Sequence, residues 1–373
     1  MEEIFLADNS LGEEFVVTLF GESHGRCVGT VVDGCPAGLE LSEADVQHEL
    51  DKRVPRTPSI TSSRIEEDKV EILSGIFQGR TTGAPIAMIV WNRDVDSLPY
   101  ERIKNVPRPG HADYPARVRY GGFNDCRGGG QFSGRLTAAL VMAGAVAKKL
   151  LAVERIEVLA HSLSIGRIQS KADLTREELR ASVYTNAVRC GDRDAASSME
   201  RAILQAAETG DSLGGTVKAV VYGVPIGVGE PLFSSLDSEL SKALFSIPAV
   251  KGVEFGLGFE ASRLTGSENN DPLVIKEGKV TFETNNAGGI LGGLSTGREI
   301  VAHVAFKPTP SIRRRQRSVN LDSMENTELE MAGRHDPCVV PKAVPVVEAV
   351  VSIVLTDLLV RSGVMPKVLK GSM

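Results

Sequence analysis

The pattern of hydrophobic positions predicts strands in the first quarter of the chain and again between residues 154 and 306. β-Branched and aromatic residues concentrate there in short runs bounded by turn-forming residues. The clearest runs are FVVTLF (15–20), VGTVVDG (28–34), ERIEVLAHSLSIG (154–166), GTVKAVVYG (215–223), AVKGVEFGLGF (249–259) and EIVAHVAF (299–306). Two further apolar runs, 70–77 and 84–91, flank a turn with glycine and predict a β-hairpin.

Two long stretches are apolar on nearly every side and predict helices that lie inside the protein. The first spans 133–152, with Ser133 as its N-cap, and the second begins near Pro341 and ends near residue 361. Residues 343–360 are almost long enough to cross a bilayer, but the proline and the two carboxylates among them favour a core helix. We therefore predict no membrane span.

Four other segments have the polar and apolar alternation of amphipathic helices. They are 41–51, 175–184, 194–210 and 234–245. We find no internal repeat, low-complexity tract or linker, so we expect a single domain over residues 1–373.

Composition narrows the class of protein and of partner. The chain has 373 residues, of which 42% are hydrophobic, as in a globular enzyme, and a net charge of −6 that disfavours nucleic acid as a partner. Its five cysteines are odd in number and lack CxxC spacing, and we see no signal-peptide-like N-terminus. These features predict a cytoplasmic protein with free thiols.

The segment from Arg108 to Arg135 has the composition of an anion-binding site. It combines arginines and glycines with His111, and it leads into the first apolar helix. Arginine presents a rigid fork to carboxylate or phosphate, and glycine lets backbone N–H groups approach an oxyanion. The alternative is a long glycine-rich connection with solvated arginines.

Three further clusters repeat this chemistry. GESHG (21–25) carries Ser23 and His24, a basic loop begins at Arg53, and GRHDP contains Arg334 and Asp336. GESHG also fits the nucleophile motif of serine hydrolases, but that motif needs a helix after the turn and here a strand is predicted. The clusters together predict a small substrate with several negative charges and proton transfer to a leaving phosphate. No metal-ligand spacing is present, so we expect no metal.

Two other regions have weaker implications. The uncharged Gly/Asn-rich region 266–297 suits contact with a cofactor, or else a flexible surface excursion, and contains no dinucleotide-binding motif. The basic run 313–317 could contact RNA, but the acidic total charge and the lack of interleaved aromatics favour a solvated loop or the rim of a ligand site.

Seven motifs, in order along the chain, resemble the chorismate synthase family. They are GESHG, RPGHADY, RGGGQFSGR, SIPAVKGVEFGLGF, NNAGGILGG, AFKPTPSI and GRHDPCVVPKAVPVVEA. The resemblance implies loss of phosphate and the carbon-6 hydrogen from 5-enolpyruvylshikimate 3-phosphate to give chorismate, in aromatic biosynthesis. It further implies reduced FMN without net redox change, a homotetramer, and an α+β sandwich with a helical core between two antiparallel four-stranded sheets.

The resemblance also implies roles for individual residues. His24 would protonate the leaving phosphate, His111 the reduced flavin, and Asp336 would assist the flavin nitrogen that accepts the substrate hydrogen. Substrate oxygens would be bound by Ser23, Arg53, Arg108, Ser133, Arg135 and Arg334. FMN would contact Gln131, Phe132, Ser133, Pro248, Ala249, Gly292, Lys307, Pro308, Thr309, Pro310, Ser311 and Arg334.

The chain departs from the family pattern at three places. Ser59 and Gln131 stand where the family commonly has arginine, and Gly134 stands where it has alanine. We expect Arg56, or else Arg64, to supply the anion contact that Ser59 cannot make. NADPH would enter only as a flavin reductant, and because no reductase domain is visible we expect a separate flavin reductase to serve this protein.

Overall fold

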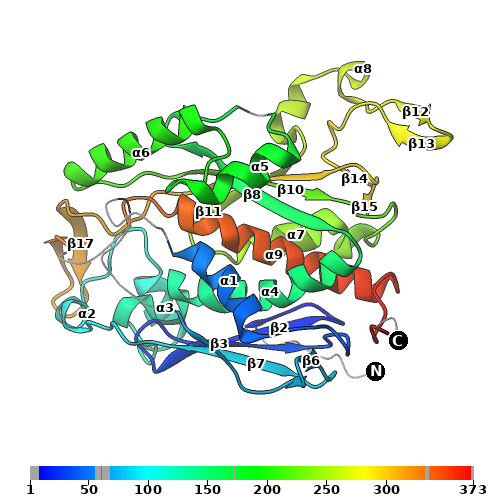
Figure 1. Ribbon diagram of the computed structural model, residues 1–373. Helices are drawn as coiled ribbons and strands as arrows, with labels where there is room; N and C mark the ends of the chain where they lie inside the picture. Colours follow the sequence, from blue (N-terminus) through cyan, green and yellow to red (C-terminus); the bar gives the residue numbers. More distant parts are fainter. Residues whose placement is uncertain (1–7, 55–59, 61–67, 172, 332–335, 371–373) are drawn as a thin grey trace.

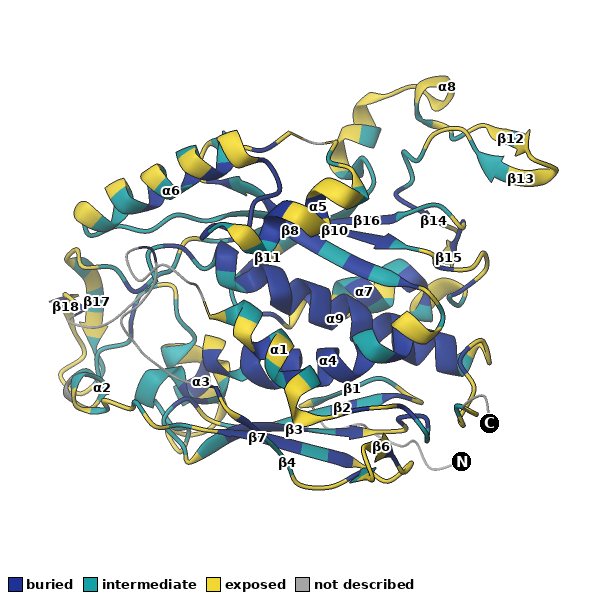
Figure 2. Ribbon diagram, in the orientation of Figure 1, coloured by how far each residue is buried: buried dark blue, intermediate teal, exposed yellow. Residues whose placement is uncertain are grey.

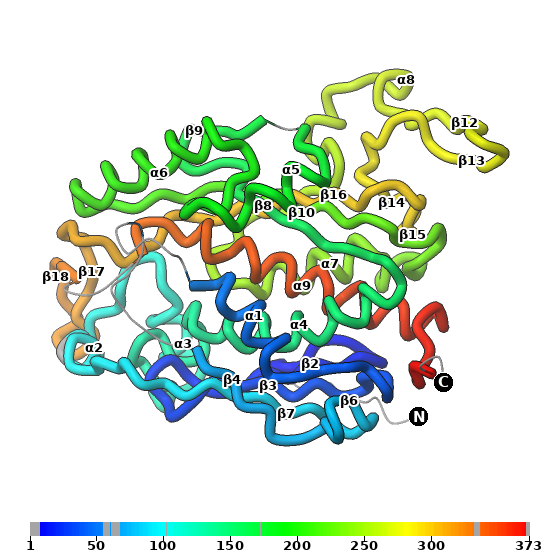
Figure 3. Tube along the Cα trace, viewed as in Figure 1, coloured from blue at the N-terminus to red at the C-terminus, as the bar shows by residue number. Residues whose placement is uncertain are grey.

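The computed structural model describes residues 8–54, 60, 68–171, 173–331 and 336–370, and it places a layer of helices between two antiparallel sheets (Figure 1). The first sheet has the order β1-β2-β3-β7-β4 and the second β11-β16-β10-β8-β9. Figure 3 shows that the first sheet comes from the N-terminal part of the chain and that the C-terminal helix lies between the sheets. The α+β class predicted from the sequence is confirmed.

The strands of the first sheet all come from the first quarter of the chain, as predicted. They are β1 (Ser10–Leu11), β2 (Val16–Gly21), β3 (Cys27–Asp33), β4 (Val70–Ile72) and β7 (Ile86–Trp91). The predicted hairpin forms by pairing of β4 with β7, and a smaller hairpin is inserted at its tip, made of β5 (Ile76–Phe77) and β6 (Arg80–Thr81).

The second sheet contains the other four predicted runs. Its strands are β8 (Glu157–Ile165), β9 (Ile168–Gln169), β10 (Gly215–Tyr222), β11 (Val250–Phe255) and β16 (Ile300–Phe306). Helices α5 (Arg176–Ser182) and α6 (Arg193–Glu208) belong to the outer side of this sheet (Figure 1).

Each sheet has five strands, whereas four were expected. The additional strands, β1 and β9, are two residues long and lie at the sheet edges. So short a strand has no hydrophobic alternation that would identify it in the sequence. The other four strands are β2, β3, β7 and β4 in the first sheet and β11, β16, β10 and β8 in the second.

The central layer consists of α1 (Glu43–Arg53), α4 (Thr137–Val153), α7 (Leu236–Phe245) and α9 (Val340–Arg361). Figure 2 shows α4 and α9 as almost wholly buried. The segments Gly134–Val153 and Val340–Arg361 are long and apolar enough to cross a membrane, but 72% and 100% of their most apolar windows are buried inside the protein. The two predicted buried helices are thereby confirmed.

The remaining elements are short. They are α2 (Leu98–Arg102), α3 (Asp113–Arg119), α8 (Gly266–Asn269), β12 (Leu273–Lys276), β13 (Lys279–Phe282), β14 (Ile290–Leu291), β15 (Leu294–Ser295), β17 (Gln316–Asn320) and β18 (Glu325–Leu329). The basic run 313–317, expected as a loop or rim, is exposed and continues into strand β17.

Candidate active site

The glycine-rich part of the 108–135 segment folds into a tight turn before α4. Gly128, Gly129 and Gly130 have φ angles of 59°, 86° and 55°, which side chains with a Cβ rarely adopt. A short 3₁₀ turn, Gly134–Leu136, then leads directly into α4, and the Ser133 side chain accepts a hydrogen bond from the Arg135 N–H. Ser133 thus caps this turn and not, as the sequence predicted, α4 itself, because the N-cap of α4 is Leu136, which makes no side-chain hydrogen bond.

The GESHG turn connects β2 to β3 and packs against this glycine turn. Ser23 is buried, and its N–H donates to the Gly130 carbonyl at 3.2 Å. His24 Nδ1 lies 2.9 Å from Ser97 Oγ, and the Tyr100 ring contacts the imidazole edge to face. A strand follows the turn, so the geometry is not that of a hydrolase nucleophile.

Glycine at position 128 allows the glycine turn to approach both side chains closely. A Cβ there would lie 2.6 Å from His24 Nε2 and 2.7 Å from Ser23 Oγ. These distances are too short for any side chain without displacement of the turn. Ser23 Oγ and His24 Nε2 therefore face the same point of the glycine turn.

Arg108 lies on the other side of the glycine turn. A Cβ on Gly129 would be 3.7 Å from Arg108 Nη2, and the Arg108 guanidinium lies over the Tyr100 ring. Asp113 accepts two hydrogen bonds of 2.7 Å from the Arg108 side chain. Burial would raise the pKa of Asp113, but the hydrogen bonds and charge of Arg108 outweigh it and lower that pKa.

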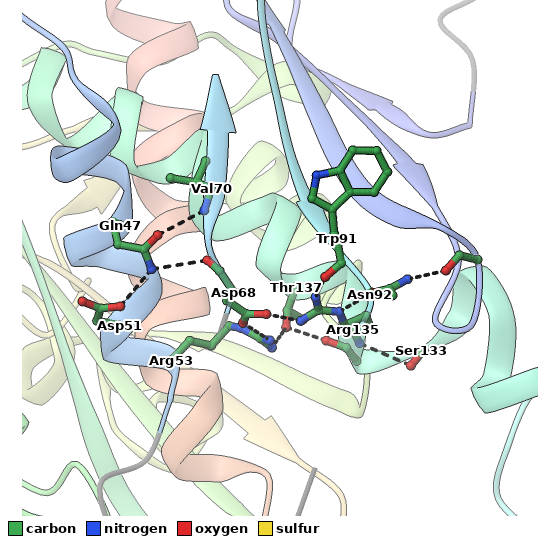
Figure 4. Close-up of polar contacts among 12 residues, drawn as sticks. Gln47, Asp51, Arg53, Asp68, Val70, Trp91, Asn92, Ser133, Arg135 and Thr137 are labelled. Atoms are coloured by element: carbon green, nitrogen blue, oxygen red, sulfur yellow. Dashed lines mark hydrogen bonds and ion pairs between the residues drawn. The ribbon is translucent and has the colours of Figure 1, made fainter. Parts of the chain in front are cut away.

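Arg53 and Arg135 converge on one buried carboxylate, that of Asp68 (Figure 4). Arg53 Nη2 donates to Asp68 Oδ2 at 2.8 Å and its Nη1 donates to Thr137 Oγ1 at 3.0 Å. Arg135 Nη1 donates to Asp68 Oδ1, and its Nε donates to Asn92 Oδ1 at 2.8 Å. Two arginines from distant parts of the sequence are thereby fixed side by side.

His111 lies where the 108–135 segment meets the loop after β16. Its Nε2 is 2.6 Å from Ser311 Oγ, and Lys307 Nζ donates to the Gly110 carbonyl at 2.5 Å. A Cβ on Gly110 would lie 2.8 Å from Pro310, so the two loops are in close contact. The predicted His111 and 307–311 sites form one region.

Two more predicted segments join this region. The Lys307 N–H donates to the carbonyl of Ala249, whose φ of 74° turns the chain after Pro248. Ser212 Oγ donates to the Thr309 carbonyl, and the next residue, Leu213, donates its N–H to the carbonyl of Pro337. Asp336, which directly precedes Pro337, pairs with Lys342 Nζ at 2.7 Å.

The structure does not place five of the residues named from the sequence in this region. Arg334 lies outside the described residues, as do Arg56, Ser59 and Arg64. Gly292 lies in the turn between β14 and β15, near the start of β16, whereas Lys307 follows the end of that strand. Within one chain Gly292 and Lys307 therefore lie toward opposite ends of β16; Figure 1 shows the β14–β15 turn.

Two hollows open beside the predicted residues. One of about 120 Å³ is lined in part by Tyr100, Arg108 and Asp113, and one of about 270 Å³ in part by Gln131 and Phe132. A third cavity, of about 550 Å³, is lined by none of the predicted site residues. The polar clusters, rather than the size of a cavity, mark the candidate site.

Sequence reasoning missed four residues that support the site: Asp68, Asn92, Ser97 and Tyr100. Asp68 and Asn92 flank strands β4 and β7 and have no neighbouring motif that would single them out. Their partners are distant in sequence, and Asp68 to Arg135 spans 67 positions. Only the paired strands and α4 bring them together.

Comparisons with known proteins agree on one family. A family model described as chorismate synthase matches residues 15–360. The chorismate synthase of Dehalococcoides mccartyi is 52% identical over 362 residues, which cover 97% of this chain and 99% of that protein. The chorismate synthase of Korarchaeum cryptofilum is also 52% identical, over 351 residues that cover 94% of this chain and 97% of that protein. A crystal structure of chorismate synthase matches with a TM-score of 0.75 and 31% identity, over 94% of this chain and 93% of that one. The chain therefore belongs to the chorismate synthase family and is a lyase.

Proposed function

We propose that this protein converts 5-enolpyruvylshikimate 3-phosphate into chorismate, by 1,4-elimination of phosphate and the carbon-6 hydrogen with reduced FMN and without net redox change. One observation carries the proposal: Ser23 Oγ and His24 Nε2 both lie against Gly128, and Arg108 lies close to the next residue, Gly129. A hydroxyl, a histidine and a guanidinium gathered around one glycine turn are groups that can bind an oxyanion and supply it with a proton.

The arginines would bind the phosphate and carboxylates of the substrate. Arg53, Arg108 and Arg135 carry three positive charges, whereas Asp68 and Asp113 supply two negative ones. The balance leaves a net positive charge for an incoming anion in a largely buried setting, where electrostatic attraction is screened less than at the surface. Ser23 and Ser133 would add hydrogen bonds from their hydroxyl groups, and Arg334 a further charge.

His24 would act as the general acid. Its Nδ1 is fixed by Ser97 and its ring by Tyr100, which leaves Nε2 directed at the glycine turn. A proton passed from Nε2 to the departing phosphate would make that group easier to expel.

The region around Ser311 has the features of a cofactor-binding cradle. Thr309 Oγ1 is buried without a hydrogen-bond partner in the described part of the chain, so a polar group of a ligand would satisfy it. The residues that would hold FMN are Gln131, Phe132, Ser133, Pro248, Ala249, Lys307, Pro308, Thr309, Pro310 and Ser311. When bound, reduced FMN supplies transient electron donation, which allows phosphate to leave despite the unfavourable 1,4 geometry.

His111 and Asp336 would manage protons on the cofactor side. His111 is held by Ser311, inside the proposed cradle, and would pass a proton to the reduced flavin. Asp336 precedes Pro337, whose carbonyl accepts a hydrogen bond from Leu213, and the neighbouring Ser212 bonds Thr309 of the cradle. Asp336 would assist the flavin nitrogen that receives the substrate hydrogen. The family contact at Gly292 remains a proposal, because one chain does not bring that residue to the cradle.

Three further proposals follow from family membership. The protein would be a single-domain chain that assembles as a homotetramer, work in the cytoplasm, and receive reduced flavin from a separate reductase, with NADPH only as the ultimate reductant. The five cysteines are free thiols, as the cytoplasmic proposal requires.

An anaerobic assay tests the proposed function. Purified protein would be mixed with the phosphorylated substrate and FMN, with and without dithionite, and chorismate would be measured by chromatography. We expect chorismate only with reduced FMN. Absence of chorismate under both conditions, with folded protein, would contradict the proposal.

A further inference from the structure

The Asp68 carboxylate is shared between two arginines that reach it from opposite sides. Arg53 comes from the last turn of α1, and Arg135 from the 3₁₀ turn before α4. The Asp68 side chain is 2% exposed, and those of Arg53 and Arg135 are 14% and 4% exposed. Asp68 therefore fixes the distance between two guanidinium groups inside the protein.

The two arginines favour the ionised form of Asp68. Burial would raise its pKa, but the positive charges of Arg53 and Arg135 outweigh burial and lower the pKa to about 2. One negative charge between two positive ones leaves one net positive charge. Arg53 Nε is buried and has no hydrogen-bond partner among the described residues, so Arg53 keeps donor capacity for a ligand.

Asn92 extends the same network to the GESHG turn. Its Oδ1 accepts from Arg135 Nε, while its Nδ2 donates to the carbonyls of Glu22 and Gly25, both at 2.9 Å. These two carbonyls flank His24 in the chain. The arginine pair and the turn that carries His24 are thus joined through one amide (Figure 4).

We propose that Asp68 and Asn92 are positioning residues that hold two anion-binding arginines and the His24 turn in one fixed arrangement. The inference rests on the proposed function, because it takes Arg53, Arg135 and His24 to act on the phosphorylated substrate. Asp68 sets the spacing of the guanidinium groups, and Asn92 holds the His24 turn in a fixed position relative to Arg135. Neither residue contacts the substrate itself.

The first test is Asp68→Asn, which keeps the size of the side chain and removes its charge. An amide presents one oxygen to two guanidinium groups, so one arginine loses its acceptor and its fixed position. We expect substrate affinity, measured by calorimetry with 5-enolpyruvylshikimate 3-phosphate, to fall about tenfold or more, as for loss of a charge-assisted contact. We expect kcat to fall as well, because Arg135 also holds Asn92.

A double variant separates positioning from general stability. If Asp68 acts through Arg53, then Asp68→Asn in an Arg53→Gln background should weaken substrate binding much less than it does alone. An equal loss of substrate affinity in both backgrounds, measured well below the unfolding temperature, would show that Asp68 has a merely structural role and would overturn the inference.

Asn92→Leu is a second test, which can be carried out even if the Asp68→Asn variant does not fold. It removes both donors to the GESHG turn and the acceptor of Arg135 Nε, while both arginines keep their contacts to Asp68. We therefore expect kcat to fall about tenfold or more and KM to rise less than in Asp68→Asn. An unchanged kcat in folded Asn92→Leu protein would overturn the inference.

Glu157→Gln is the matched control. The Glu157 carboxylate also joins two arginines, Arg176 and Arg180, but these contacts involve no predicted site residue. We expect wild-type kcat and KM for this variant. If wild type binds the substrate and Asp68→Asn behaves like the control, the inference alone fails. If wild type neither binds nor converts the substrate, the proposed function fails and the inference with it.

Discussion

His24 and His111 have different hydrogen-bond partners and should fail in different ways when replaced. His24 is held by Ser97 beside the glycine turn, and His111 by Ser311 in the proposed flavin cradle. Loss of a general acid commonly lowers a rate by about 10² to 10⁴. We expect both alanine variants to fold, bind substrate and turn over slowly.

Only His111→Ala should also change the absorbance of bound reduced flavin as pH is varied across neutrality. Anaerobic titration of both variants and wild type, with substrate present, measures this. A spectral change in His24→Ala but not in His111→Ala would reverse the two assignments. Full activity in both variants would refute the site.

The low pKa of Asp68 predicts a contribution to stability that acid removes. Its pKa is about 2 in the folded protein, below its ordinary value of 3.8, so the folded state favours the charged form. The contribution is complete above the unfolded pKa and is lost as pH falls through about 2. A shift of this size corresponds to about 2 kcal/mol.

Denaturant unfolding of wild type and Asp68→Asn between pH 5 and pH 2 would measure this effect. We expect the difference in their unfolding free energies to shrink toward low pH, because only wild type loses the ion pairs. Glu49, whose pKa is also about 2, titrates in both proteins and cancels in the comparison. A difference that stays constant with pH would contradict the expectation.

At the scale of elements, the contact between α4 and α9 depends on Gly144. A Cβ at this position would lie 2.5 Å from the Ala349 Cα, so the two helices approach too closely for any side chain. Gly144→Ala should therefore lower the free energy of unfolding by about 1 to 3 kcal/mol, although alanine favours helix more than glycine. Urea unfolding at a fixed protein concentration measures the change.

Gly134→Ala is the control for this prediction. A Cβ on Gly134 meets no atom within 4 Å, and its φ is not in the left-handed range. We expect unchanged stability and activity, which also suits the alanine that the family commonly has there. If Gly144→Ala were as stable as wild type, α4 and α9 could move apart at that position without loss of stability, which would contradict the prediction.

The major elements were predictable because their sequences carry strong local patterns. Helix α1 begins after Ser42 with a capping box to Asp45, and α9 is apolar on all sides. The edge strands β1 and β9 were not predictable, because two residues hold no periodic pattern. Helix α3 was also missed, because its first residue follows a loop with no side-chain cap.

The candidate site was predictable where residues sit in motifs and not where they act through the fold. His24, His111 and Arg108 lie in glycine-rich segments whose composition indicates anion chemistry. Asp68 meets Arg135 only after β4 has paired with β7. Such a contact depends on tertiary structure, which no local pattern encodes.

At the scale of the whole molecule, the two sheets and the central helices share one hydrophobic core. Buried residues of β2, β16, α4 and α9 belong to the same core cluster in the described part of the chain. The GESHG turn belongs to the first sheet and the 307–311 loop to the second. The predicted site residues are therefore contributed by segments that follow strands of both sheets. The single domain and the homotetramer stay predictions.

The stoichiometry of turnover tests the proposed elimination most directly. Under anaerobic conditions, a limiting amount of reduced FMN would be added to the protein with excess 5-enolpyruvylshikimate 3-phosphate, and chorismate, phosphate and reduced flavin would be counted. We predict one phosphate for each chorismate, many of both for each flavin, and reduced flavin still present at the end. Consumption of one reduced flavin for each product, or chorismate formed without phosphate, would contradict an elimination that has no net redox change.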